Sequence, residues 1–163
     1  MTEKEAGPVN PTIRCACGHP DLSASTNQQY HLVRIPDGPL TRDCFKLVIA
    51  GVPEPKGGEV LLRVQYISID AANLVPMQGA GMVMAGQGLG EVIESLAPDF
   101  EVGDLVFGEC GWQEYAALPG TSLVKQPHAD ANADVVAGFD NLPDALIGLL
   151  HGENRGKRMV RIA

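Results

Sequence analysis

Three soft ligands close together near the N-terminus are the first candidates for chemistry in this sequence. Cys15, Cys17 and His19 lie within five consecutive residues. Zinc sites commonly place about two to four residues inside each ligand pair and need a second pair further along the chain. The Cys-x-Cys spacing is tighter than that, and no matching pair of cysteines or histidines follows it. We therefore expect no metal site.

Nucleophilic catalysis is the second chemistry to consider. A hydrolytic triad needs a histidine that acts on a serine or cysteine in a recognisable nucleophile motif. The sequence has no such motif around its four histidines, which are His19, His31, His128 and His151. These residues therefore do not support a hydrolase.

Two glycine-rich segments, residues 79–84 and 86–90, are the third candidates. A dinucleotide site needs glycines in a tight turn between a strand and a helix whose N-terminus faces the pyrophosphate. The first segment lacks the third glycine of that motif and precedes no predicted helix, and the second opens a predicted strand. There is no Gly-Lys-Ser/Thr phosphate loop either. We therefore expect no dinucleotide-binding turn in this chain.

The net charge of −8 argues against a nucleic-acid partner, because phosphate binding needs clustered lysines and arginines. The nearest basic cluster is Arg155, Lys157 and Arg158, with Arg161 beyond it. This cluster falls between a predicted helix and a predicted strand, where positive charge stabilises the helix dipole. We interpret it as structural.

Composition and hydropathy indicate a globular chain with many turns. Hydrophobic residues make up 45% of the sequence, and 19 glycines with 12 prolines favour short strands over a helical bundle. No apolar run reaches the length of a membrane span, and residues 1–5 do not begin a signal peptide. We expect a cytoplasmic protein with reduced thiols and no membrane partner.

The elements that would position the candidate residues are mostly strands. Apolar or alternating runs between Gly/Pro turns are typical of strands. The longest run, residues 59–69, alternates with Val60, Leu62, Val64 and Tyr66 on one face. The other predicted strands are residues 29–34, 44–49, 89–95, 105–108, 112–118 and 122–125. Strands at this spacing predict a closed or nearly closed β-barrel.

The C-terminal part has a helical pattern instead. Apolar residues recur at helical spacing from Phe139 onward, with Asp140 or Asn141 as the N-cap and Gly152 at the end. Residues 158–162 form a predicted strand that returns to the barrel. The predicted organisation is a flexible N-terminal extension over residues 1–26, a β-barrel over 27–134, and a helix and strand over 135–163.

Several motifs follow one another in a specific order along the chain. They are Val52-Pro53-x-Pro55-x-x-Gly58-Glu59-Val60-Leu61-Leu62-Arg63-Val64, Tyr66-Ile67-Ser68-Ile69-Asp70, Gly81-x-Val83-Met84-x-Gly86-x-x-x-Gly90-Glu91-Val92, Phe100-x-Val102-Gly103-Asp104-Leu105-Val106-Phe107-Gly108, Gly111-Trp112-Gln113-Glu114-Tyr115, and Gly138-Phe139-x-Asn141-x-Pro143 with Gly152-x-Asn154-x-Gly156-Lys157. With this set the chain resembles the medium-chain dehydrogenase/reductase superfamily. More narrowly, it resembles the zinc-free branch of prostaglandin, curcumin and alkenal reductases.

The resemblance implies a mainly β fold with a C-terminal helix, namely the GroES-like β-barrel that forms the catalytic domain of these enzymes. It also implies a Rossmann domain inserted between the two parts of the barrel. Here residues 127–133 run directly into 135–139, so we expect the nucleotide-binding domain to be missing. Enzymes of this branch transfer a hydride from NADPH to an enone. We expect this chain alone to bind no NADP(H) and to be inactive.

The resemblance also assigns residues to the cofactor cleft. Asn154 matches an amide that faces the cofactor, and Asp70, Met84 and Gly86 match positions at the nicotinamide end. Each also has an ordinary structural alternative, as a loop cap, a strand-end polar residue, a core residue and a turn glycine respectively. Residues 71–74 lack the tyrosine and arginine that the family offers to a substrate, so no catalytic residue is assigned.

Three hypotheses follow from these observations. The chain is the substrate domain of an NADP-dependent enone reductase without its cofactor-binding domain, a non-catalytic β-barrel binding module, or half of a split enzyme that docks with a separate nucleotide-binding domain. In each case the surface that the second domain would cover, including parts of residues 71–85, is expected to be exposed. An exposed apolar patch favours self-association, so we expect dimers or larger species through this cleft.

Overall fold

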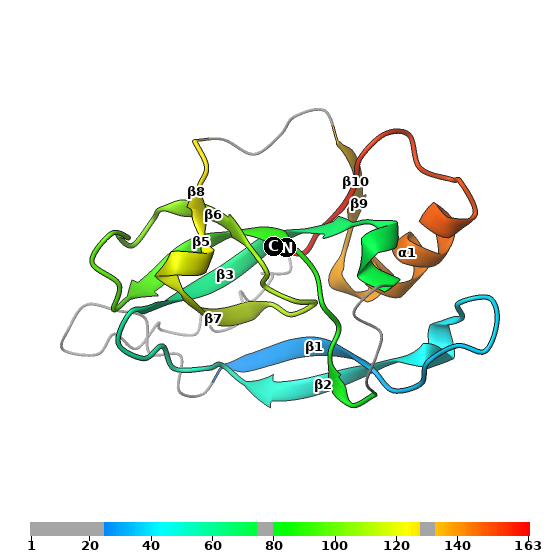
Figure 1. The fold of residues 1–163 in the computed structure, drawn as a ribbon, viewed down its shortest axis with the longest axis horizontal. Coiled ribbons are helices and arrows are strands. Elements are labelled where there is room, and N and C mark those ends of the chain that lie inside the picture. The colour runs from blue at the N-terminus through cyan, green and yellow to red at the C-terminus, as the bar shows by residue number, and fades with distance from the viewer. Residues whose placement is uncertain (1–24, 75–79, 128–132) are drawn as a thin grey trace, which may run out of the picture.

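The computed structural model describes residues 25–74, 80–127 and 133–163, which form two β-sheets and a short helix (Figure 1). The strands are β1 (Thr26–Leu32), β2 (Phe45–Gly51), β3 (Glu59–Ile69), β4 (Met82–Val83), β5 (Gly88–Ser95), β6 (Leu105–Gly108), β7 (Tyr115–Pro119), β8 (Val124–Lys125), β9 (Asp134–Ala137) and β10 (Arg158–Arg161). The helix α1 spans Leu142–Leu150, and the 3-10 turns are η1 (Arg42–Cys44), η2 (Ala71–Leu74), η3 (Gly120–Ser122) and η4 (Phe139–Asn141). None of the helices in these ranges has the length and apolar character needed to cross a membrane.

The long strand β3 lies at the centre of the larger sheet. One of its edges pairs with β5, while the other pairs with β7 at its N-terminal end and with β10 at its C-terminal end. β6 and β8 extend the sheet beyond β5, and β9 extends it in parallel beyond β10. The β-branched and apolar residues between Val60 and Ile69 favour this buried central position.

The smaller sheet has the order β2-β1-β4 and is tied to the larger one just before β7. The fully buried side chain of Asn27 makes much of this tie. Its carbonyl oxygen accepts hydrogen bonds from the N–H groups of Glu114 (3.1 Å) and Tyr115 (3.0 Å), and its amide donates to the carbonyl of Tyr115 at 2.9 Å. A buried amide with all these partners joins two segments that are far apart in the sequence.

Aromatic side chains hold the main core together. The fully buried Trp112 stacks on Phe45 with ring centroids 5.4 Å apart and meets Tyr30 edge-on at 6.4 Å. Tyr30 stacks in turn on Phe139 at 5.4 Å. A second cluster of buried apolar residues lies on β3, β5 and β6 and on the segments next to β5 and β8. It consists of Val60, Leu62, Val92, Ala97, Val106 and Leu123. The aromatic set therefore connects the smaller sheet and the segment before β7 to the C-terminal segment.

The segment 133–163 completes the same core rather than forming a separate unit. Leu142 and Leu146 on α1 are fully buried in the main cluster, together with Val160 of β10. Because α1 presents these residues to β3 and β10, the helix covers one end of the larger sheet (Figure 1). The predicted return of the C-terminal strand to the sheet is confirmed by the pairing of β10 with β3.

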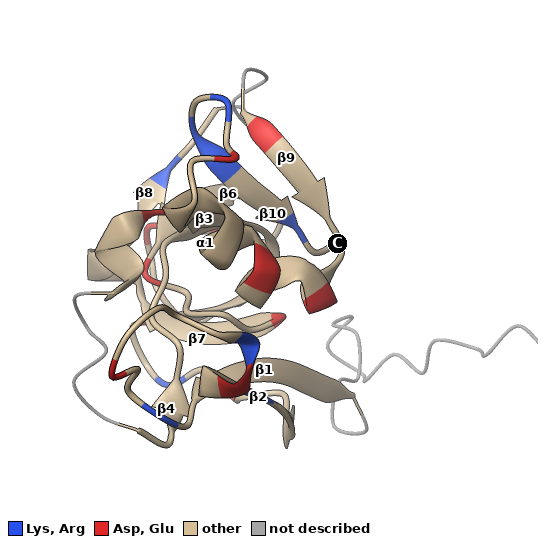
Figure 2. Cartoon of the chain, turned by 90° about the vertical axis from the view of Figure 1, so that its right-hand side faces the viewer, with Lys and Arg blue, Asp and Glu red and all other residues tan. Residues whose placement is uncertain are grey.

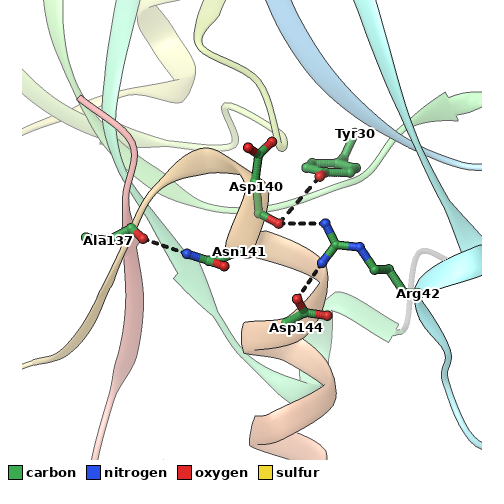
Figure 3. A network of polar contacts seen from close by, with 6 residues as sticks. All are labelled: Tyr30, Arg42, Ala137, Asp140, Asn141 and Asp144. Carbon is green, nitrogen blue, oxygen red and sulfur yellow. Dashed lines mark hydrogen bonds and ion pairs between the residues drawn. The ribbon is translucent and has the colours of Figure 1, made fainter.

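A polar network fixes the start of α1 (Figure 3). Arg42 of η1 forms an ion pair with Asp144 and donates to the carbonyl of Asp140 at 3.1 Å. Asn141 occupies the N-cap position, as predicted, but its amide donates to the carbonyl of Ala137 at 2.7 Å instead of capping the helix. Two carboxylates, those of Asp140 and Asp144, therefore lie at the first turn of α1, and Arg42 balances part of their charge.

The predicted fold class is confirmed, since the described chain is mainly β with a C-terminal helix. The strand predicted over residues 59–69 has those bounds. Leu61 and Ile67, on the other face of the predicted strand, are buried as well, and the ladder to β5 is irregular at two points. No closed barrel is found among residues 25–74, 80–127 and 133–163. Closure of the barrel therefore stays a prediction.

The sequence prediction also missed one strand, and part of it cannot be compared with the structure. The strand β9 is missing from the predicted set, because Asp134–Ala137 pairs only with β10, which lies more than 20 residues later. The Cys15, Cys17 and His19 group and most of the extension over residues 1–26 lie outside the described residues. The division of the chain at residues 27 and 135 stays a prediction.

Candidate functional site

The C-terminal end of β3 leaves the sheet at Asp70, and local polar contacts hold the turn that follows. The Asp70 carboxylate accepts a hydrogen bond from the N–H of Ala72 at 2.8 Å, as an aspartate does at the start of a helical turn. The buried Asn73 accepts from the N–H of Asp70 at 2.8 Å and donates to the carbonyl of Ala85 at 3.2 Å. Asn73 therefore connects the turn η2 to the segment that precedes β5.

The facing segment contains Gly86, which lies directly on the indole of Trp112. A Cβ atom at this position would lie 2.8 Å from Cδ1 and 2.9 Å from Nε1 of Trp112. Interiors are close-packed, so this approach requires glycine. The buried Nε1–H of Trp112 has no hydrogen-bond partner within the described part of the chain. Glycine thus lets the backbone of this segment lie directly on the core.

Two adjoining hollows lie at this end of β3. The first has a volume of about 240 Å³ and is lined by Ser68, Asp70, Ala72, Asn73, Ala85, Gly86, Gln87, Glu109 and Lys157. The second has a volume of about 380 Å³ and is lined by Ile69, Asp70, Ala71, Leu149, Asn154, Gly156, Lys157 and Arg158. Because Asp70 and Lys157 line both, we treat the two hollows as one site and call it the β3-end cleft.

Basic residues gather in the loop between α1 and β10 (Figure 2), and Lys157 and Arg158 line the second hollow. Arg158 is largely buried and donates to the Asp134 carboxylate from Nε at 3.1 Å and from the guanidinium terminus at 3.0 Å. The pKa of the Asp134 carboxyl is held below its ordinary value, first by the N–H of Arg155 and then by Arg158. This tie fixes the loop to β9 and places Lys157 at the cleft.

The thiols and acidic groups of the described residues offer little other chemistry. Burial raises the pKa of the Cys110 thiol to about 12, so this cysteine stays protonated and is a poor nucleophile at neutral pH. No group of three or more His, Cys, Asp or Glu side chains that could hold a metal occurs in residues 25–74, 80–127 and 133–163. The polar β3-end cleft is therefore the best candidate for a functional site.

The structure brings together three of the four residues that the sequence assigns to the cofactor cleft. Asp70 and Gly86 line the first hollow, and Asp70 and Asn154 line the second. Met84 does not join them, because its side chain is buried in the main core beneath the cleft-forming segment. Asn154 donates to the carbonyl of Gly156 at 2.8 Å, so it also fills the loop-capping role that was its structural alternative.

Two cleft residues are missing from the sequence prediction. The contacts of Asn73 across the cleft reveal that it joins both walls. Lys157 belongs to the basic cluster that the sequence suggests is structural, yet it lines both hollows. A polar residue three positions after a strand-end aspartate is the one sequence signal that points to Asn73.

The family of the chain follows from comparison with known proteins. Residues 28–126 match the family model described as the N-terminal domain of oxidoreductase, which is more than half of the chain. The chain therefore belongs to this family of oxidoreductase domains. Its relatives include the NADPH-dependent curcumin reductase of Escherichia coli (strain K12), which is 33% identical over 135 residues, covering 76% of this chain and 39% of the relative.

Two further similar proteins support the same family assignment. The 2-alkenal reductase (NADP(+)-dependent) of Nicotiana tabacum is 30% identical over 111 residues, covering 61% of this chain and 32% of the relative. The crystal structure of CurA from Vibrio vulnificus superposes with a TM-score of 0.57 and 33% identity, over 62% of this chain and 32% of that chain. The predicted membership of the zinc-free reductase branch is confirmed. The chain spans well under half the length of these relatives.

Proposed function

We propose that this chain is the substrate-binding domain of an NADP-dependent reductase that acts on carbon–carbon double bonds conjugated to a carbonyl group, and that it is inactive alone. The observation that carries this proposal is the β3-end cleft, which gathers Asp70, Gly86 and Asn154. The names of the curcumin and 2-alkenal reductases support the same reaction class.

The residues of the cleft fit the nicotinamide end of NADPH better than its phosphates. The first hollow, at about 240 Å³, has room for one ring system and is smaller than most drug-sized sites. The N-terminus of α1 is the candidate phosphate site within the described ranges, but Asp140 and Asp144 lie there. Carboxylates at that end repel a phosphate, so a second unit must hold the rest of the dinucleotide.

Each cleft residue has a chemical use in such a reaction. NADPH, when bound, supplies the hydride, and negative charge then develops on the substrate's carbonyl oxygen. Lys157 places a cation where both hollows meet, and a nearby cation stabilises such a charge. Asn154 retains hydrogen-bonding capacity for an amide or carbonyl group of a ligand, because a side-chain amide has two donor hydrogens and an acceptor oxygen. Gly86 lets the backbone at the floor of the cleft lie directly on Trp112, where a Cβ atom would clash.

Binding experiments on the intact chain test the proposal. We expect a titration with NADPH, followed by nucleotide fluorescence, to show no saturable binding tighter than about 10 μM, which corresponds to about −7 kcal/mol. In NMR spectra, millimolar reduced nicotinamide mononucleotide should shift the amide signals of Asp70, Gly86 and Asn154, whereas adenosine monophosphate should not. Tight NADPH binding would refute the claim of inactivity. Equal shifts with both mononucleotides would refute the assignment of the cleft.

A split enzyme is a second candidate, and one feature of the fold favours it. The segment 133–163 completes the core through α1 and β10, so the chain has the contacts of a unit that folds by itself. Such a unit could dock with a separately made nucleotide-binding domain. Co-purification of a nucleotide-binding protein, identified by mass spectrometry and able to restore NADPH-dependent turnover, would support it. If neither cofactor binding nor such a partner is found, the hypothesis of a non-catalytic binding module remains.

A further inference from the structure

The first hollow of the β3-end cleft carries more negative than positive charge. Among its described lining residues, Asp70 and Glu109 contribute two carboxylates and Lys157 contributes the one cation. Asp70 and Lys157 also line the second hollow, whereas Glu109 lines only the first. In the second hollow, Arg158 is balanced by its ion pair with Asp134. Glu109 is therefore the charge that distinguishes one end of the cleft from the other.

Two segments that are tied to each other hold Glu109 at this hollow. Glu109 directly follows β6, and two residues later the N–H of Gly111 donates to the carbonyl of Gly86 at 2.8 Å. The backbone carbonyl of Gln87 accepts a hydrogen bond from the N–H of Ser68 on β3, also at 2.8 Å. The side-chain amide of Gln87 donates to Oε1 of Glu109 at 2.7 Å. This bond positions the carboxylate and uses only one of its two oxygens.

A ring bound in the first hollow lies close to both carboxylates. The hollow has a volume of about 240 Å³, which is enough for one ring system. Asp70 belongs to the turn after β3, where its carboxylate accepts from the N–H of Ala72 at 2.8 Å. Glu109 belongs to the segment that is tied to Gly86 on the facing wall. The two carboxylates therefore reach the hollow from different walls.

Hydride transfer creates the kind of charge that such a site stabilises. The transfer breaks the C4–H bond of the reduced nicotinamide ring and forms a C–H bond at the β-carbon of the enone. It leaves one positive charge on the ring. The electron pair of the enone's double bond moves toward the carbonyl oxygen and gives an enolate, which then takes a proton from water. Fixed carboxylates beside the ring favour the positive form, because preorganised charges stabilise the charge that develops in the transition state.

We propose that Asp70 and Glu109 flank the nicotinamide ring in the first hollow and stabilise the positive charge that develops on it. This inference rests on the proposed function, and it adds which hollow takes the ring and what the two carboxylates do there. Lys157, where the hollows meet, then lies on the side of the substrate's carbonyl oxygen. The second hollow suits the ring less well, because Lys157 and Arg158 line it and Glu109 does not.

The affinities of oxidised and reduced nicotinamide mononucleotide test the inference, because the two forms differ by one positive charge on the ring. NMR titrations of the full chain at low salt give both dissociation constants from the amide signals of Gly86 and Gln87. We expect the oxidised form to bind at least about threefold more tightly. The expected ratio is modest because both carboxylates are exposed to solvent. Added salt should lower the ratio further.

Isosteric substitutions separate the two carboxylates from the overall charge of the chain. Glu109→Gln and Asp70→Asn each remove one negative charge, and a side-chain carbonyl remains to accept the bonds from Gln87 and Ala72. Glu54→Gln removes the same charge from the exposed loop before β3, at the opposite end of that strand from Asp70. We expect each cleft variant to lower the affinity ratio at least about twofold and Glu54→Gln to leave it unchanged. Amide spectra show whether each variant keeps the fold.

The experiment distinguishes failure of this inference from failure of the proposed function. If neither form of the mononucleotide shifts the signals of the cleft, both fail together. If the two forms bind equally, or if the reduced form binds more tightly, the inference alone fails and the cofactor site stands. The inference also fails if the cleft variants leave the ratio unchanged, or if Glu54→Gln lowers it as much as they do. A ratio that falls only in Glu109→Gln and Asp70→Asn supports it.

Discussion

Asn27 and Asn154 carry the same amide in opposite surroundings. Asn27 is fully buried between β1 and the segment before β7, and its side chain bonds to backbone groups of Glu114 and Tyr115. Asn154 lines the β3-end cleft, and its amide donates to the carbonyl of Gly156 in its own loop. The first amide holds the two sheets together, while the second depends on nothing outside its loop.

This contrast separates residues that build the fold from residues that are available to a ligand. A buried amide with distant partners is costly to remove, because each partner is left without a hydrogen bond. A half-buried amide with a local partner can exchange that partner at little cost. The same test places Asn73 between the two, since it is buried and yet joins the two walls of the cleft.

The largest effect is expected for Asn27→Leu. The substitution removes the acceptor for the N–H groups of Glu114 and Tyr115 and the donor to the carbonyl of Tyr115. We expect the free energy of unfolding to fall by about 3 kcal/mol or more. Urea denaturation followed by Trp112 fluorescence measures this, because the chain has one tryptophan. A loss below about 1 kcal/mol would contradict the structural role given to this amide.

Gly86→Ala tests the boundary between the two regions, because Gly86 rests on the core and also lines the cleft. The added Cβ would meet the indole of Trp112 at 2.8 Å. We expect a loss of about 1–3 kcal/mol in unfolding free energy, the usual range for overpacking, and a changed emission maximum of Trp112. Gly38→Ala is the matched control, because its Cβ meets nothing within 4 Å and its φ is not positive. Equal stability of the two variants would show that the segment can move off the core.

Sequence alone predicts the parts of this molecule that depend on local pattern. The bounds of β3 follow from an apolar run between Gly58 and Asp70, and α1 follows from helical spacing with Pro143 in its first turn. β9 is missed because its pairing with β10 is not local. The irregularities of the β5 ladder were not predicted, because they depend on packing.

The cleft is less predictable, because its walls meet only through long-range pairing. Asp70, Gly86 and Asn154 were assigned through the resemblance, and the structure brings them to one site through β3, β5 and β10. Lys157 is missed, since the pairing of β10 with β3 is what carries its loop to the end of β3. Met84 carries the same resemblance, yet its side chain packs inward. Motif matching therefore identifies the segment, and packing decides which side chains reach the cleft.

Asp134→Asn should have a smaller effect that depends on pH. The pKa of Asp134 is lowered in the folded chain by the N–H of Arg155 and by Arg158, so its charged form stabilises the fold above the unfolded pKa of about 4. That contribution disappears as the pH falls through the lower, folded pKa. We expect the variant to melt below the original chain at pH 7 and to match it near pH 2. A difference in melting temperature that stays constant between these pH values would contradict this origin.

Asn154→Ala should have the smallest effect on stability and the clearest effect on the cleft. The side chain is half-buried and bonds within its own loop, so we expect the unfolding free energy to change by less than about 0.5 kcal/mol. If Asn154 is available to a ligand, the variant should abolish the shifts that reduced nicotinamide mononucleotide causes near residue 154 and preserve those at Gly86. Unchanged shifts near residue 154 and at Gly86 would show that Asn154 only caps its own loop. A large loss of stability would instead move it into the same class as Asn27, and the distinction between the two amides would fail.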